Sequence, residues 1–167
     1  MLLLRRATAA DVPALVVIAR RAWLGAFAES APPSLIAAWR ARDREPAWYA
    51  KHWPTVTVAL LFGKHVGLVQ PAGDEINGLW VDPAHEGEGI GDALLRAAER
   101  EIAAAGHTHA WLTCSGFNPR ALEFYRAKGY AERERGAEIV ADGVIDRVYV
   151  LERALGAAAP AASGAPG

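Results

Sequence analysis

The spacing of apolar residues predicts helices in the first third of the chain. Residues 2–8 (LLLRRAT) form a short strand-like run, and after Thr8 apolar residues recur every three or four positions until near Gly25. This period is typical of an amphipathic helix with one buried face. Residues 32–53 predict one or two further helices, interrupted at Pro46 because proline lacks the N–H that a helix interior requires.

The middle of the chain changes to the pattern of β-strands. Its segments are rich in β-branched and aromatic residues and are separated by turn residues, Gly63-Lys64 and PAGD (71–74). Such short connections join antiparallel neighbours, so we expect an antiparallel meander. The expected strands are 55–62, 65–70 and 75–81.

The second half alternates helices and strands. Ile90 to Ile102 carries apolar residues at helical spacing, and Gly106 is a typical helix stop. A second helix starts with Asn118 as its N-cap and Pro119 at its first position. The remaining expected elements are a strand at 109–114, the end of the second helix at Gly129, and strands at 131–140 and 144–152.

The resulting order of elements is β-α-α-β-β-β-α-β-α-β-β. The strand–helix–strand crossover in its middle requires at least one parallel pair beside the antiparallel strands. The pattern therefore predicts an α/β protein of the α+β type, with a mixed, largely antiparallel central sheet flanked by helices.

Composition limits the class of protein and its partners. The chain has 167 residues, 52% apolar and 22% charged, which is typical of one soluble domain. We expect this domain at 1–155 and a disordered Ala/Pro/Gly tail at 156–167. The net charge of −1 argues against a nucleic-acid partner, and no run reaches the ~18 apolar residues of a membrane span. The single cysteine, Cys114, excludes an internal disulfide and favours a cytoplasmic location.

The loop HEGEGIG, residues 85–91, is a candidate ligand site. A P-loop requires Lys-Ser/Thr after its last glycine, whereas Gly91 precedes Asp92-Ala93, and the G-x-G-x-x-G dinucleotide fingerprint is also absent. Two interpretations stay open for this motif alone, an anion-binding helix N-terminus and a ligand-free turn. Glu86 and Glu88 are unexpected beside an anion, because like charges repel.

Two spaced motifs carry a family resemblance. The segment LWVDPAHEGEGIGDALL (79–95) and the later segment NPRALEFYRAKGY (118–130) resemble the signatures of the GNAT superfamily of acyl-CoA-dependent N-acetyltransferases. In that family, V-x-P ends a strand, Q/R-x-x-G-x-G/A opens a helix, and N-x-x-A-x-x-x-Y-x-x-x-G-F follows later. Glu86 stands where the family has Gln or Arg, and Tyr130 replaces the Phe. The element order from about residue 2 to 153 is similar as well, so the expected fold is GNAT-like.

The resemblance implies a binding site for acetyl-CoA, which would be the acyl donor. Main-chain N–H groups of the glycine loop would hold its pyrophosphate, and the strand before the loop would pair with the pantetheine arm. A bulge in that strand would free an N–H, of Leu79 or Trp80, for the thioester carbonyl. The implied cofactor-binding residues are Leu79, Trp80, Val81, Glu86, Gly87, Glu88, Gly89, Ile90, Gly91, Asn118 and Tyr125.

The resemblance also implies an acid, and the residues suggest a base. Tyr125 matches the family's general acid, although its helical spacing also fits a core tyrosine. Glu75 is the candidate general base, and the alternative is an exposed residue at a strand start. In a regular strand it would share a face with Leu79 and Val81. Water can relay the proton, and the alternatives among histidines are His52, His65 and His85.

Other site chemistries are less well supported by the residues. His107 and His109 lack a third ligand, so we expect no metal site. Cys114 as an acyl-carrying nucleophile would need a paired histidine, whereas the resemblance implies direct transfer in a ternary complex. Asn118 can bind cofactor, cap its helix, or do both.

The function expected from the resemblance is transfer of acetyl from acetyl-CoA to a primary amine of a small molecule or peptide. The alternative is a degenerate acyl-CoA-binding module or sensor, in which Glu86 and Glu88 have weakened catalysis. The acceptor and the oligomeric state stay open, with a homodimer as one alternative. Four tryptophans are either helix packing or walls of an acceptor pocket: Trp23, Trp39, Trp48 and Trp53.

Overall fold

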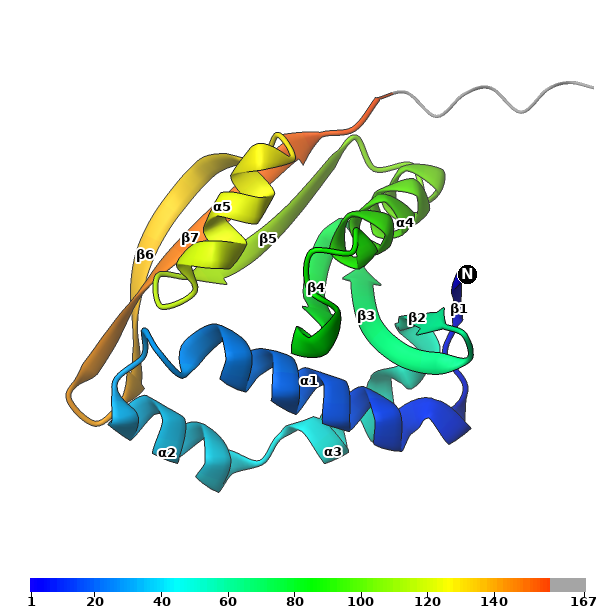
Figure 1. Ribbon diagram of the computed structural model, residues 1–167. Coiled ribbons are helices and arrows are strands. Elements are labelled where there is room, and N and C mark those ends of the chain that lie inside the picture. Colours follow the sequence, from blue (N-terminus) through cyan, green and yellow to red (C-terminus); the bar gives the residue numbers. More distant parts are fainter. Residues whose placement is uncertain (157–167) are drawn as a thin grey trace, which may run out of the picture.

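Seven strands form one sheet in the order β1-β2-β3-β4-β5-β7-β6 (Figure 1). The computed structural model describes residues 1–156. Neighbouring strands are antiparallel except β4 and β5, which are parallel. The predicted mixed, largely antiparallel sheet is therefore confirmed. The strands are β1 (Leu2–Arg6), β2 (Thr57–Leu61), β3 (Lys64–Ala72), β4 (Glu75–Val81), β5 (His109–Ser115), β6 (Ala131–Ala141) and β7 (Val144–Ala154).

Helices cover both faces of this sheet (Figure 1). Short 3-10 turns at Ala9–Asp11, Trp53–Thr55 and Pro83–His85 accompany them. The tail predicted at 156–167 lies outside the described residues, apart from Gly156. The helices are α1 (Val12–Phe27), α2 (Pro33–Arg42), α3 (Glu45–His52), α4 (Ile90–Ala104) and α5 (Pro119–Ala127).

Two helix boundaries differ from the sequence prediction. The segment 32–53 holds two helices, and they separate at Asp43, which has a left-handed backbone with φ of 41°. Pro46 lies in the first turn of α3, where a missing N–H leaves no hydrogen bond unmade. Gly25 does not end α1, which continues to Phe27. A Cβ on Gly25 would lie 3.0 Å from Cγ of Pro83, so this glycine permits close packing instead.

The turn between β2 and β3 is also displaced by one residue. Phe62 and Gly63 form it with φ of 50° and 79°, and Lys64 already belongs to β3. Positive φ at both central residues is the geometry of a tight two-residue hairpin.

The core divides into two layers, one on each face of the sheet. α4 and α5 cover a cluster that includes Ile76, Leu94, Leu112 and Tyr125. On the other face, α1 and α3 cover a second cluster, and the ends of α1 and β7 meet in a third that contains Phe27. The strands β2 and β3 are buried on both faces, whereas β6 is exposed along most of its length.

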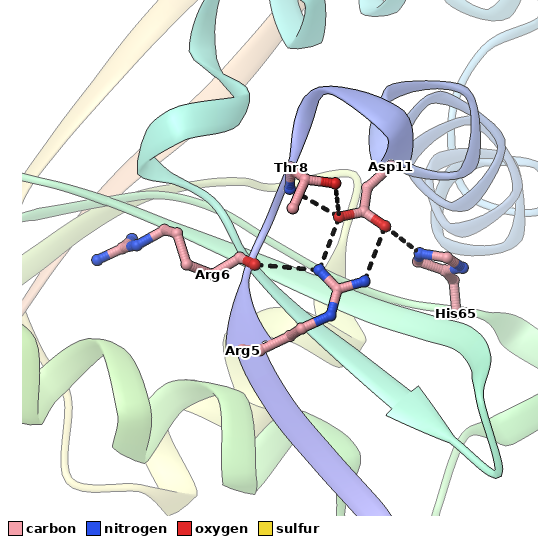
Figure 2. A network of polar contacts seen from close by, with 5 residues as sticks. All are labelled: Arg5, Arg6, Thr8, Asp11 and His65. Atoms are coloured by element: carbon pink, nitrogen blue, oxygen red, sulfur yellow. Dashed lines mark hydrogen bonds and ion pairs between the residues drawn. The ribbon is translucent and has the colours of Figure 1, made fainter.

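A polar network fixes the start of α1 to the sheet (Figure 2). Asp11 is 4% exposed, and its carboxylate accepts two hydrogen bonds from the guanidinium of Arg5, at 2.7 and 3.0 Å. It also accepts from the Thr8 N–H at 2.7 Å and lies 2.7 Å from Nε2 of His65 on β3. One carboxylate thereby joins β1, β3 and α1.

Candidate active site

The parallel strands β4 and β5 pair at one position only, Glu75 with Trp111. Beyond that point they diverge, and a cavity of about 250 Å³ lies between them, called the inner cavity here. Its walls include Trp23 and Phe27 of α1 on one side of the sheet and Tyr125 of α5 on the other. The separation of the two strands therefore opens the sheet to both faces.

Strand β4 carries a bulge beside this opening. Ile76 pairs with Pro71 and Leu79 with Val69, so Asn77 and Gly78 together lie opposite one β3 residue. The bulge expected from the resemblance is thus present.

Because of the bulge, Glu75 lies on the other face of the sheet than it would in a regular strand. The extra residue reverses the alternation of side chains, so Ile76 packs on the same cluster as Leu79 and Val81. Glu75 instead shares the opposite face with Trp80, toward α1, and lines the inner cavity with Trp23. It does not share a face with Leu79 and Val81, as a regular strand would require.

The glycine loop leads directly into the N-terminus of α4. Gly87 and Gly89 have φ of 78° and 80°, a conformation that favours glycine. Within residues 1–156, the N–H groups of 87–89 donate to no carbonyl or side chain, and the first-turn N–H groups of α4 have no intrahelical partner. The loop therefore presents a row of free donors at the positive end of a helix dipole.

A groove of about 510 Å³ lies against this loop, between α4 and α5, and is called the α4–α5 groove here. It contains all the predicted cofactor-binding residues except Glu88. The strand β4 forms one wall, and Ala22 and Ala26 of α1 form another. Those lining it are Leu79, Trp80, Val81, Glu86, Gly87, Gly89, Ile90, Gly91, Asn118 and Tyr125.

The two glutamates of the loop are partnered and differ in position. Glu86 lines the α4–α5 groove and forms an ion pair with Arg120. Glu88 lies 3.2 Å from Nδ1 of His85. The charge of Glu86 is therefore offset at the groove, and Glu88 is outside its walls.

Tyr125 lines both the inner cavity and the α4–α5 groove. Its side chain is buried, and this burial raises the pKa of the phenol above its ordinary range. The phenol consequently keeps its proton at neutral pH. The two interpretations of Tyr125 are compatible, because the residue packs on Phe124 and Tyr130 and also lines both cavities.

The candidate bases are distributed unequally around the site. Burial, and to a lesser degree Asp74, raise the pKa of Glu75, which lines the inner cavity. His65 is held by Asp11, and the His52 ring packs on Trp48 at a centroid distance of 4.1 Å, with the two planes tilted by 34°. Neither His52 nor His65 lines the inner cavity or the α4–α5 groove.

Asn118 and Cys114 complete the inner wall. Asn118 caps α5, because its Oδ1 accepts from the Ala121 N–H at 3.2 Å, and it also lines both spaces. Burial, together with Asp146, raises the pKa of Cys114 to about 12. The thiol has no histidine partner among the described residues, so it is not activated as a nucleophile.

Comparison with known proteins identifies the family of this chain. Residues 13–130 match the acetyltransferase (GNAT) family. The chain belongs to the GNAT family. No curated protein matches it.

Solved GNAT structures share the fold at low sequence identity. A GCN5-related N-acetyltransferase from Rhodopseudomonas palustris has a TM-score of 0.80 and 23% identity, covering 92% of this chain and 95% of the other. The PaiA N-acetyltransferase from Thermoplasma acidophilum, in complex with coenzyme A, has a TM-score of 0.75 and 18% identity, covering 92% of this chain and 99% of the other. YncA from Salmonella typhimurium, a putative acetyltransferase with acetyl-CoA, has a TM-score of 0.71 and 21% identity, covering 97% of this chain and 99% of the other.

Several groove residues of this GNAT chain are absent from the sequence prediction. Arg120 and Lys128 supply cations, and Phe124 supplies an apolar wall. All three lie in the second motif, Arg120 and Phe124 on α5 and Lys128 at its C-cap. They are four residues apart, so this helical spacing, which places them on one face, was an available signal. Ala22 of α1 had no such signal, because it is distant in sequence from both motifs.

A third space, called the outer cavity here, adjoins the inner cavity of this GNAT fold. It has a volume of about 240 Å³ and shares Trp23, Phe27 and Ser115 with the inner cavity. The four tryptophans differ in their surroundings. Trp23 and Trp39 line the outer cavity, whereas Trp53 packs in the core and Trp48 donates to Gln70 at 3.0 Å.

Residues 1–156 contain neither a candidate metal cluster nor a helix that could span a membrane. No group of three or more His, Cys, Asp or Glu side chains in residues 1–156 is arranged to hold a metal ion. Across the same residues, no helix has the length and apolar character that a membrane crossing requires.

Proposed function

We propose that this GNAT protein transfers an acetyl group from acetyl-CoA to a primary amine of a small molecule or peptide, by direct transfer in a ternary complex. The observation that carries the proposal is the position of Tyr125. Its ring lies at the opening between β4 and β5, where the α4–α5 groove and the inner cavity meet. A donor in the groove and an acceptor in the cavity would thus meet beside a proton source.

The residues of the α4–α5 groove fit coenzyme A. Free N–H groups at 87–89 and at the start of α4 suit a pyrophosphate. A Cβ at Gly87 or Gly89 would meet open space, so positive φ, rather than crowding, is the reason for glycine there. Lys128, which is paired with Asp92 at 2.9 Å, and Arg120 add positive charge at the wall.

Acetyl-CoA would supply an acetyl group activated as a thioester, and the chain's own residues would do the rest. Beyond Glu75, β4 no longer pairs with β5, so an N–H of Leu79 or Trp80 that points away from β3 would be free to stabilise the oxygen that gains negative charge. As the amine nitrogen bonds to the carbonyl carbon and the C–S bond breaks, the Tyr125 hydroxyl would give its proton to the departing thiolate, and the phenolate would regain a proton from the nitrogen of the new amide. Glu75, directly or through water, would take a proton from the incoming ammonium.

The test is a thiol-release assay with acetyl-CoA and a broad panel of amines. We expect turnover on at least one amine, and a fall in kcat of at least about tenfold in Tyr125→Phe, in the range typical of general acids. Coenzyme A affinity should change little in this variant, because the phosphate-binding backbone is untouched.

Tyr130→Phe is the matched control. It removes a neighbouring hydroxyl that lines neither the groove nor the inner cavity, so turnover should be retained. Coenzyme A binding without turnover on any amine would contradict the proposal and support a degenerate acyl-CoA-binding module. Equal turnover in wild type and Tyr125→Phe would remove the phenol from the mechanism.

A further inference from the structure

A stack of three aromatic rings lines the outer cavity. The Trp23 ring lies between those of Trp39 and Phe27, with centroid distances of 4.2 and 4.5 Å and nearly parallel planes. Trp39 ends the stack on one side and is further held by a hydrogen bond from its Nε1 to Glu45 at 2.7 Å. The outward face of Trp39 can therefore stack on a ligand with a planar or aromatic body, and such a face also attracts cations.

A buried carboxylate lies in the same cavity. Asp146 of β7 is 6% exposed and lines the outer cavity. It accepts a hydrogen bond from the Gly116 N–H at 3.1 Å, and no cationic side chain in residues 1–156 pairs with it. A buried carboxylate without a cationic partner strongly favours a ligand that brings a positive charge.

The cavity also has basic residues, but they are placed differently. Arg42 and Arg44 are both exposed, and Arg42 is engaged with the Val140 carbonyl at 3.0 Å. Water screens charges at such exposed positions, whereas it screens the buried Asp146 much less. The cavity should therefore bind a cationic group at Asp146 more strongly than it binds an anionic group at the arginines.

The Asp146 carboxylate lies close to the junction of the two cavities. Its Oδ1 is 3.1 Å from the N atom of Gly116, which follows Ser115, and Ser115 lines both cavities. An acceptor with its amine in the inner cavity can thus place a second charged group at Asp146 across a short spacer.

From these observations we propose that the acceptor is a primary amine with a flat, preferably aromatic, body and a second cationic group, which Asp146 recognises. The inference rests on the proposed acetyl transfer for the place of the reacting amine. Trp39, held in place by Trp23, would bind the body of the acceptor, and Asp146 would determine specificity for its distal charge.

The test uses three amines of one shape that differ only in the distal group. Para-xylylenediamine carries an ammonium, para-methylbenzylamine a methyl group, and para-(aminomethyl)benzoate a carboxylate. Binding is measured by calorimetry in the presence of coenzyme A without an acetyl group, so no transfer can occur. We expect wild type to bind the diamine at least about tenfold more tightly than the methyl compound, and the carboxylate most weakly.

Asp146→Asn should reduce the diamine preference to about threefold or less. Asparagine keeps an oxygen that accepts from Gly116, so the local fold has its hydrogen bond. Asp142→Asn removes an equal charge at an exposed position in the β6–β7 turn and should leave the preference unchanged. Trp39→Leu should weaken all three amines by a similar factor.

Equal binding of the three amines by wild type would overturn the inference without any variant. A preference that survives in Asp146→Asn would also overturn it. The thiol-release assay reports acetyl transfer separately. A diamine preference without turnover would contradict the proposed function and leave the charge selection at Asp146 standing.

Discussion

The α4–α5 groove and the outer cavity are built by different means. The groove presents main-chain N–H groups held by glycines with positive φ, whereas the outer cavity presents the side chains of Trp23, Trp39 and Asp146. A ligand bound by backbone is insensitive to most nearby side-chain changes, and a ligand bound by side chains depends on each of them. Binding in the α4–α5 groove should therefore depend on backbone conformation, and binding in the outer cavity should depend on individual side chains.

The largest expected effect is on the backbone of the groove. In Gly89→Val, a β-branched residue would have to adopt φ of 80°, which such residues strongly avoid. The loop should leave this conformation and lose the row of free N–H donors. We expect coenzyme A affinity, measured by calorimetry, to fall by at least about a hundredfold, or roughly 2.7 kcal/mol.

Gly63→Val supplies the matched control for this change. Gly63 has φ of 79°, and a Cβ there, as at Gly89, would meet nothing within 4 Å. It lies in the β2–β3 turn and lines none of the three cavities. Both variants thus have similar backbone strain, and only Gly89→Val should lose coenzyme A. Equal losses would mean that strain in the fold, and not the loop itself, is responsible.

The next effect is on the stability of the fold, through the Asp11 network at the start of α1. The paired Arg5 guanidinium lowers the pKa of Asp11 well below its usual range, against the opposing effect of burial, and Thr8 and His65 lower it further (Figure 2). Asp11→Asn should lower the free energy of unfolding by about 2 kcal/mol at pH 7, typical of hydrogen bonds to a charged group. Coenzyme A affinity should change little, because this network lies away from the α4–α5 groove.

The sign of the pH dependence follows from the lowered pKa. The Asp11 carboxylate stabilises the fold fully above its unfolded pKa of about 3.9, and this contribution is lost as pH falls toward the folded pKa. Urea unfolding should show the difference between wild type and Asp11→Asn shrinking from pH 5 downward. Asp142→Asn, which removes an exposed charge, serves as control. A difference that stays constant down to pH 2 would contradict the role of this ion network.

The same contrast explains what the sequence could predict. The groove is assembled mainly from two continuous segments, 79–91 and 118–128, so spacing and motif are visible along the chain. The outer cavity joins Trp23, Trp39 and Asp146 from three distant elements, and no local spacing connects them. The face that Glu75 shares with Leu79 and Val81 was predicted only for a regular strand. One inserted residue in β4 reverses the alternation of side chains beyond it, so the position of the bulge decides the face of Glu75.

A smaller effect is expected at Tyr130, beside Tyr125 in the core. Its hydroxyl is buried and has no hydrogen-bond partner among the described residues. Tyr130→Phe removes this unpaired group and should raise the free energy of unfolding by about 1 kcal/mol in urea titrations. A loss of stability instead would mean that the hydroxyl has a water partner. If stability rises as expected, the two tyrosines, 5.7 Å apart, have different roles: the Tyr125 hydroxyl is needed for catalysis, and the Tyr130 hydroxyl lowers the stability of the fold.

The smallest expected effect tests the loop glutamates. Glu86 lines the α4–α5 groove and holds Arg120, whereas Glu88 lies outside the groove walls beside His85. Glu86→Gln should free the Arg120 guanidinium for a phosphate and tighten coenzyme A binding by about threefold at low salt, within the range of exposed ion pairs. Salt should remove most of the gain, because exposed charges are screened. Glu88→Gln removes an equal charge two residues further along the loop and should change the affinity little. If the two variants gave the same gain, general charge and not the release of Arg120 would be the cause, and the side chains of the groove would matter less than its backbone.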